Sequence, residues 1–195
     1  GLQRAAFDRT GARLCGVRGA HGATGGAPAG ASVFDVETGR ELARTDAAQW
    51  AAGYGVPSCA FSLDGALLLA DGALWDVRAG SLARRFDKLS AAPLGCGAFH
   101  PNGVDVLLDG AVWDVRSPRL LRVVPQLDQC CVAFAGGGAL YAYAPPALDD
   151  LEGGVGLAAG RRRGRDRQFH VLDARDYRPL HTHELERPLV HLAAD

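Results

Sequence analysis

One unit of sequence occurs twice in the middle of the chain. The segment AFSLDG at residues 60–65 returns as AFHPNG at 98–103, and DGALWDVR at 71–78 returns as DGAVWDVR at 109–116. Both matches have the same offset of 38 residues, so nothing is inserted or deleted between them. A fixed internal period indicates a series of equivalent structural units that stack, because one such unit cannot bury its faces alone.

The period and the Trp-Asp pair near the end of each unit predict WD repeats, each forming one four-stranded blade of a β-propeller. Two weaker copies flank the clear pair, one with Phe34 in the place of the tryptophan and one that keeps only the aspartate, Asp173. We therefore predict an all-β WD-repeat segment over residues 1–195. The expected repeats are about 5–45, 56–88, 93–124 and 129–185, with an insertion at 145–167. Since a propeller of this class has roughly 4–8 blades, we expect an incomplete or excerpted ring.

Short apolar runs within the two clear repeats indicate strands. The runs have five residues each and cover 66–70, 73–77, 104–108 and 111–115. Asp-Gly pairs at 71–72 and 109–110 separate consecutive runs and predict type I′ hairpins, because glycine readily adopts the positive φ that this turn requires. Such closely spaced turn residues exclude a helical interpretation.

The composition is that of an ordinary globular protein, with 48% hydrophobic residues, 22% charged residues and a formal net charge of −1. No charge bias points to nucleic acid or a membrane, and no apolar run approaches the roughly 18 residues of a membrane-spanning helix. The five cysteines form no CxxC pair. We expect them to be buried strand residues with free thiols, in a reducing intracellular compartment, rather than metal ligands or disulfide partners.

The repeated Trp-Asp pairs have different expected roles for their two residues. Trp75 and Trp113 should pack between blades, because large aromatic residues at a repeated strand position usually belong to the core. Asp76 and Asp114 follow directly and should point away from the tryptophans, because side chains alternate along a strand.

Arg78 and Arg116 occupy the same position in adjacent repeats and should project from one face of the propeller. As ordinary surface residues they would pair with a nearby aspartate, an interaction that contributes little to stability. Alternatively, the two guanidinium groups could insert into an acidic or carbonyl-lined pocket of a partner, because each presents a planar fork of five donors.

The paired Trp-Asp-x-Arg motifs resemble the WDxR motifs of substrate receptors of cullin-4-type RING ubiquitin ligases. Four further segments resemble the WD-repeat domain of the Vpr-binding protein family, namely residues 86–88, 99–103, 124–130 and 176–179. The resemblance implies a non-catalytic receptor that docks on the damaged-DNA-binding adaptor protein of the ligase. In such a receptor Arg78 and Arg116 would contact the adaptor, and Asp76 and Asp114 would position them. It also implies protein substrates, no cofactor, and a location in the nucleus or also the cytoplasm.

Two repeats depart from the motif. Residues 35–37 read Asp-Val-Glu and lack the arginine, so the first repeat should not contribute to this contact. Residues 172–175 contain the aspartate and the arginine but no tryptophan, and we assign Arg175 no role.

The residues leave other functions open. The chain could be a WD-repeat scaffold of an unrelated complex, with structural arginines. The arginine cluster at 161–167 could bind nucleic acid, but its glycine-rich insertion has no aromatic residues for base stacking, so a solvated loop is favoured. No nucleophile motif, phosphate loop or HExxH sequence indicates an enzyme. We expect His181 and His183 to be ordinary surface or strand residues rather than metal ligands.

Overall fold

The computed structural model describes residues 4–18, 30–45, 58–70, 72–86, 96–117, 119–145 and 167–189. Asp71, the arginines within 161–166 and most of the predicted insertion at 145–167 lie outside these stretches. Within them, the chain forms four separate four-stranded antiparallel sheets, which confirms the predicted all-β class. The described part contains no helix long and apolar enough to cross a membrane.

Each sheet is one blade, and we number the blades 1 to 4 along the chain. Blade 1 comprises β1 (Arg4–Phe7), β2 (Arg13–Arg18), β3 (Gly30–Asp35) and β4 (Glu41–Arg44), and blade 2 comprises β5 (Cys59–Phe61), β6 (Leu67–Ala70), β7 (Ala73–Asp76) and β8 (Leu82–Arg85). Blade 3 comprises β9 (Gly97–Phe99), β10 (Asp105–Leu108), β11 (Ala111–Asp114) and β12 (Leu120–Val123), and blade 4 comprises β13 (Cys131–Ala135), β14 (Ala139–Tyr143), β15 (Gln168–Asp173) and β16 (Pro179–Glu184). Two short 3-10 helices, η2 (Pro125–Leu127) and η3 (Gly136–Gly138), precede β13 and β14.

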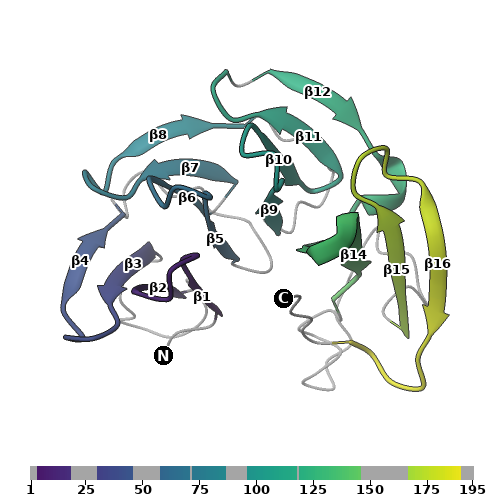
Figure 1. Cartoon of the computed structure of the whole chain (residues 1–195), viewed down its shortest axis with the longest axis horizontal. Coiled ribbons are helices and arrows are strands. Elements are labelled where there is room, and N and C mark those ends of the chain that lie inside the picture. The colour runs from purple at the N-terminus through teal and green to yellow at the C-terminus, as the bar shows by residue number, and fades with distance from the viewer. Residues whose placement is uncertain are drawn as a thin grey trace, which may run out of the picture.

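The blades follow one another around an arc (Figure 1). Within every sheet the neighbouring strands are also neighbours in sequence. The first strands β1, β5 and β9 lie toward the inside of the arc, and the last strands β4, β8, β12 and β16 lie on the outside (Figure 1). Since β5 contacts both β1 and β9, and β9 contacts β13, the first strands line the inner side of the arc.

The turn between β10 and β11 shows why this sequence folds into hairpins. Asp109 and Gly110 have φ angles of 48° and 77°, as a type I′ turn requires, which confirms the hairpin predicted at this pair. Gly110 is also held close to the following linker. A Cβ at this position would lie 2.9 Å from the backbone nitrogen of Asp128, so a side chain here would force the backbone to move.

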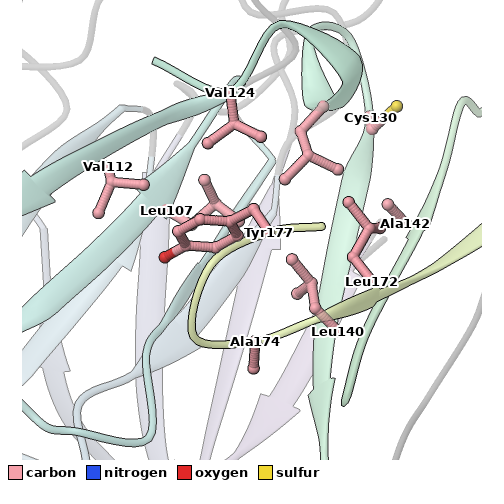
Figure 2. Close-up of a cluster of buried hydrophobic side chains, with 10 residues drawn as sticks. Leu107, Val112, Val124, Cys130, Leu140, Ala142, Leu172, Ala174 and Tyr177 are labelled. Atoms are coloured by element: carbon pink, nitrogen blue, oxygen red, sulfur yellow. The ribbon is translucent and has the colours of Figure 1, made fainter. Parts of the chain in front are cut away.

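A hydrophobic core fills each of the three junctions between neighbouring blades. The junction of blades 3 and 4 is the example in Figure 2, where Leu107 and Val112 of blade 3 face Leu140 and Leu172 of blade 4. The hydroxyphenyl ring of Tyr177 is buried in the same cluster. Stability therefore depends on contacts between consecutive blades as well as on hydrogen bonds within them.

The two tryptophans of the motif lie at two of these junctions. Trp75 is 1% exposed and belongs to the core that joins blade 2 to blade 1, where its Nε1 donates to the backbone oxygen of Ala70 at 3.0 Å. Trp113 is 4% exposed and belongs to the core that joins blade 3 to blade 2. Its ring lies 5.3 Å from that of Phe86, and its Nε1 has no hydrogen-bond partner among the described residues.

Blade 1 carries the same row of apolar residues but leaves it open. Phe7, Leu14 and Phe34 pair across β1, β2 and β3 just as Phe61, Leu68 and Trp75 pair across blade 2. In blade 2 the row faces blade 1, whereas in blade 1 it faces away from the rest of the arc. Phe7 is consequently 62% exposed.

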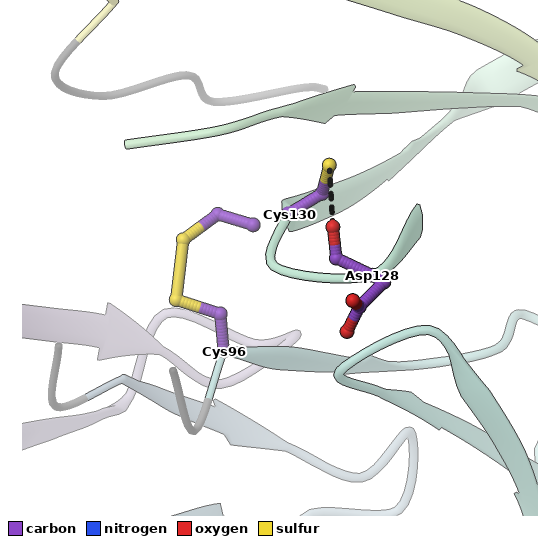
Figure 3. The surroundings of a disulfide bond; sticks show 4 residues. Cys96, Asp128 and Cys130 are labelled. Carbon is purple, nitrogen blue, oxygen red and sulfur yellow. Dashed lines mark hydrogen bonds between the residues drawn. A yellow bond between two sulfur atoms is a disulfide. The ribbon is translucent and has the colours of Figure 1, made fainter. Parts of the chain in front are cut away.

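A disulfide joins blades 3 and 4. Cys96, just before β9, and Cys131, at the start of β13, are bonded with their Cα atoms 5.0 Å apart (Figure 3). Our expectation of free thiols was therefore wrong for these two cysteines. The inner strands of adjacent blades run close together, and this brings the two cysteines into the range of Cα separations that a disulfide can span. Cys15, Cys59 and Cys130 form no disulfide within the described part of the chain.

The side chain of Arg13 makes one contact within blade 1 and two contacts that connect blade 1 to blade 2. Its Nε donates to Oδ2 of Asp8 at 2.8 Å, its Nη1 donates to the backbone oxygen of Gly65 at 3.0 Å, and its guanidinium lies 5.5 Å from the ring centre of Phe61. Burial alone would raise the pKa of Asp8, but hydrogen bonds from Arg13 and Thr10 outweigh it and lower this pKa to about 2. Asp8 is thus ionised at neutral pH.

We expect Asp8→Asn to remove a pH-dependent part of the stability. The folded-state pKa of Asp8 lies below its unfolded value, so its contribution is complete above about pH 4 and disappears as the pH falls toward 2. The side chain is only 3% exposed, and the loss at neutral pH should be about 1–2 kcal/mol. Urea denaturation of wild type and variant at several pH values measures it. Plotted against pH, the unfolding free energies of wild type and Asp8→Asn should converge at acidic pH. The control Glu37→Gln, at an exposed position of blade 1, should give the same curve as wild type.

Candidate functional site

The connections between strands fall on two sides of the arc. In an antiparallel sheet, the first and third connections leave from the same end of the strands. A repeated hydrogen bond joins them within each blade. The bond from Val77 N to Ala66 O measures 3.0 Å in blade 2, and that from Val115 N to Val104 O measures 2.8 Å in blade 3. We call this surface of blades 2 and 3 the turn face and define it by residues 62–66, 76–81, 100–104 and 114–117.

The aspartate of each motif organises the turn that follows it. Oδ1 of Asp76 accepts from the backbone N–H of Ala79 at 2.8 Å, and Oδ1 of Asp114 accepts from those of Arg116 and Ser117 at 2.7 and 3.1 Å. Backbone hydrogen bonds from Ser117 and Arg116 lower the pKa of Asp114. Asp35 and Asp173 cap the equivalent turns of blades 1 and 4 in the same way.

A change of register precedes every one of these aspartates. The pairing of the third and fourth strands shifts between Leu74 and Trp75 in blade 2 and between Val112 and Trp113 in blade 3. An irregularity of this kind bends a strand and re-aims the side chains beside it. The tryptophan beside the irregularity enters the junction, and the aspartate that follows it caps the turn.

Arg78 and Arg116 both project from the turn face and are exposed. The side chain of Arg116 is 76% exposed, and its Nη2 lies 3.6 Å from Oδ2 of Asp114, a distance that allows only a weak ion pair. Arg78 makes no ion pair with any described residue. Asp76 holds the backbone of its turn rather than the guanidinium of Arg78. Both arginines therefore keep most of their hydrogen-bonding capacity for other groups.

Two exposed apolar residues lie on the same surface, and sequence reasoning missed them. Leu63 is 44% exposed and Val104 is 37% exposed, each in the first hairpin turn of its blade. These two turns touch across the blade junction, because a Cβ on Gly103 would lie 3.4 Å from Cδ1 of Leu63. Their only signal in the sequence is an apolar residue beside an Asp-Gly or Asn-Gly turn.

The other candidates form no site in the described part of the chain. His181 and His183 lie on the exposed strand β16, and the ring of His183 stacks on Phe169 at 4.6 Å. No cluster of His, Cys, Asp and Glu in the described residues could hold a metal ion. Arg167 is the one residue of the predicted arginine cluster that the structure describes, and it is exposed. Arg175 is exposed at the blade 4 position equivalent to Arg78 and Arg116.

Comparison with known proteins relates the chain to one group. It is 34% identical over 173 residues to DDB1- and CUL4-associated factor homolog 1 of Caenorhabditis elegans, which covers 84% of this chain. The protein of the same name from Arabidopsis thaliana is 34% identical over 139 residues, or 69% of this chain. Protein mahjong of Drosophila melanogaster is 32% identical over 132 residues, or 65% of this chain. This chain is a homologue of the DDB1- and CUL4-associated factor 1 proteins.

The similarity covers only a small part of these relatives, because the chain spans 7 to 9% of their length. No family model matches the chain. Among solved structures, the Cps50 (Swd1) β-propeller domain of Myceliophteria thermophila superposes with a TM-score of 0.58 at 17% identity. The match covers 96% of this chain and 56% of that one, which identifies the arc as part of a β-propeller.

Proposed function

We propose that this chain is a non-catalytic part of a substrate receptor for a cullin-4-type RING ubiquitin ligase and that it docks on the ligase's DDB1-type adaptor through Arg78 and Arg116. Support comes from the names of its homologues, which describe association with DDB1 and CUL4. The observation that carries the docking proposal is the pair of exposed arginines at equivalent positions of adjacent blades, both on the turn face.

The local structure suits these arginines to docking. Each lies within an aspartate-capped turn, so the backbone that carries the guanidinium is fixed before binding. Rigid presentation lowers the entropic cost of association. A guanidinium fork can donate parallel hydrogen bonds to a carboxylate or to clustered carbonyl groups, and arginine is enriched among residues that dominate interface energies.

The propeller itself performs no chemistry in this proposal. It holds the adaptor with the turn face, and other surfaces of the receptor present protein substrates for ubiquitin transfer. We propose the nucleus as the main location, with the cytoplasm as a second one. No cofactor or nucleic acid takes part.

The test is binding of purified adaptor to the full-length protein, measured by biolayer interferometry. Arg78→Ala and Arg116→Ala should each weaken binding by about 2 kcal/mol, or about 30-fold, and the double variant should nearly abolish it. Arg78→Lys should restore only part of the affinity, because lysine keeps the charge but loses the planar fork.

Arg175→Ala is the matched control, since Arg175 has the same position and exposure in blade 4. It should bind the adaptor as tightly as wild type. Equal binding by the double variant, with an unchanged melting curve, would contradict the proposal. The arginines would then be surface residues of a WD-repeat scaffold that serves another complex.

A further inference from the structure

We infer that Leu63 and Val104 form an apolar centre of the surface that docks the adaptor. The inference rests on the proposed function and specifies the chemistry of the partner. The adaptor must present a nonpolar side chain next to the carboxylates or carbonyl groups that receive the two arginines.

The first observation is that the apolar residues and the arginines occur together. Among the four described first hairpin turns, those of blades 2 and 3 contain an exposed leucine or valine. The equivalent turns of blades 1 and 4 are Asp-Arg-Thr-Gly and Ala-Gly-Gly-Gly. Blades 2 and 3 are also the blades that carry the complete Trp-Asp-x-Arg motif. Blades 2 and 3 therefore combine the complete motif with an exposed leucine or valine in the first turn, whereas blade 4 has the exposed Arg175 without such a residue.

The second observation is that the four turns form one continuous surface. The turn that holds Arg78 is bonded to the Leu63 turn through Val77 and Ala66, and the turn that holds Arg116 is bonded to Val104 itself through Val115. The Leu63 and Val104 turns meet where Gly103 lies against Leu63. A partner that contacts both arginines would thus cover the apolar residues as well.

The third observation concerns charge. The exposed aspartate of this surface, Asp64, is engaged within its own turn, because Oδ1 accepts from the Ser62 hydroxyl at 2.6 Å and from the Ala66 N–H at 3.0 Å. Asp76 and Asp114 likewise bind backbone N–H groups. The arginines then have no strong internal partner among the described residues, and an acidic or carbonyl-rich surface with a nonpolar knob complements this face.

The experiment measures binding of the purified adaptor to full-length Leu63→Ala, Val104→Ala and the double variant. We expect about tenfold weaker binding for each single variant and a larger loss for the pair. Rising salt should weaken the arginine contacts, while the fold-change caused by the apolar truncations should stay constant. Leu42→Ala and Val123→Ala are the controls. Their side chains are 42% and 52% exposed on β4 and β12, and both variants should bind normally.

The possible outcomes separate the two proposals. Wild-type affinity of the Leu63/Val104 double variant, alongside lost binding of the Arg78/Arg116 double variant, would overturn the inference and leave the docking proposal intact. Normal binding by both double variants, or no binding of the adaptor to wild type, would overturn both. Equal losses for the apolar variants and for the two controls would also refute the inference, since the effect would not be local to the turn face.

Discussion

Replacing Trp75 with alanine is expected to lower the free energy of unfolding by about 3–5 kcal/mol. The indole is 1% exposed and fills the junction between blades 1 and 2, so its removal leaves a cavity at an interface on which both blades depend. The hydrogen bond from Nε1 to Ala70 is lost at the same time. Urea denaturation followed by tryptophan fluorescence and by far-UV circular dichroism measures the loss.

Phenylalanine variants separate packing from hydrogen bonding. Trp75→Phe removes a buried donor together with its bond to Ala70, whereas Trp113→Phe removes an Nε1 that has no partner in the described structure. Trp75→Phe should therefore cost about 1 kcal/mol more than Trp113→Phe. Equal costs would show that the bond to Ala70 contributes nothing net, and an alanine variant that is as stable as wild type would contradict the assigned junction.

Loss of the disulfide between Cys96 and Cys131 is expected to destabilise the fold by about 4 kcal/mol. The bond closes a segment of 35 residues and joins the inner strands of blades 3 and 4, so it restricts the unfolded chain and ties two blades together. The double variant Cys96→Ala plus Cys131→Ala, compared with wild type by denaturation without reductant, gives the magnitude.

The matching control is the same comparison in dithiothreitol. Reductant should destabilise wild type toward the level of the variant and leave the variant unchanged, because Cys15, Cys59 and Cys130 form no disulfide among the described residues. Insensitivity of wild type to reductant would show that the bond contributes no stability. Sensitivity of the variant would locate the redox effect at another cysteine.

The blades could be predicted because their signals are local and repeated. Turn glycines separate the strands, and an aromatic or aliphatic residue recurs before the aspartate that ends the third strand. Phe34 and Leu172 replace the tryptophan in blades 1 and 4, yet they pair with Leu14 and Leu140 in the register that Trp75 has in blade 2. A degenerate repeat therefore keeps its geometry as long as size and apolar character are retained.

Contacts between blades could not be predicted from the same signals. The disulfide and the bond from Arg13 to Gly65 join different sheets, and their formation depends on the angle between adjacent blades, which the period does not specify. A clue existed for the cysteines, because Cys96 and Cys131 both stand three residues before a repeat phenylalanine. Equivalent positions on adjacent inner strands approach each other as the blades converge.

The candidate site could be predicted only in part. Motif position alone led to the expectation that Arg78 and Arg116 share a face, but neither the motif nor its spacing indicated which side chains surround them. The exposure of Leu63 and Val104 depends on how two hairpin turns from different blades meet. The capping role of Asp76 and Asp114 follows from turn geometry, whereas the motif predicted only that these aspartates position the arginines.

The open row makes blade 1 one of the two less supported blades of the described arc. Phe7 of this row is 62% exposed, and among the described blades 1 and 4 each share one core with a neighbour where blades 2 and 3 share two. In a stack of such units, local opening starts at the unit with the fewest neighbours. Amide protons of β1 and β2 should accordingly exchange with deuterium before those of β6 and β10, so that protection is highest in the middle of the described arc.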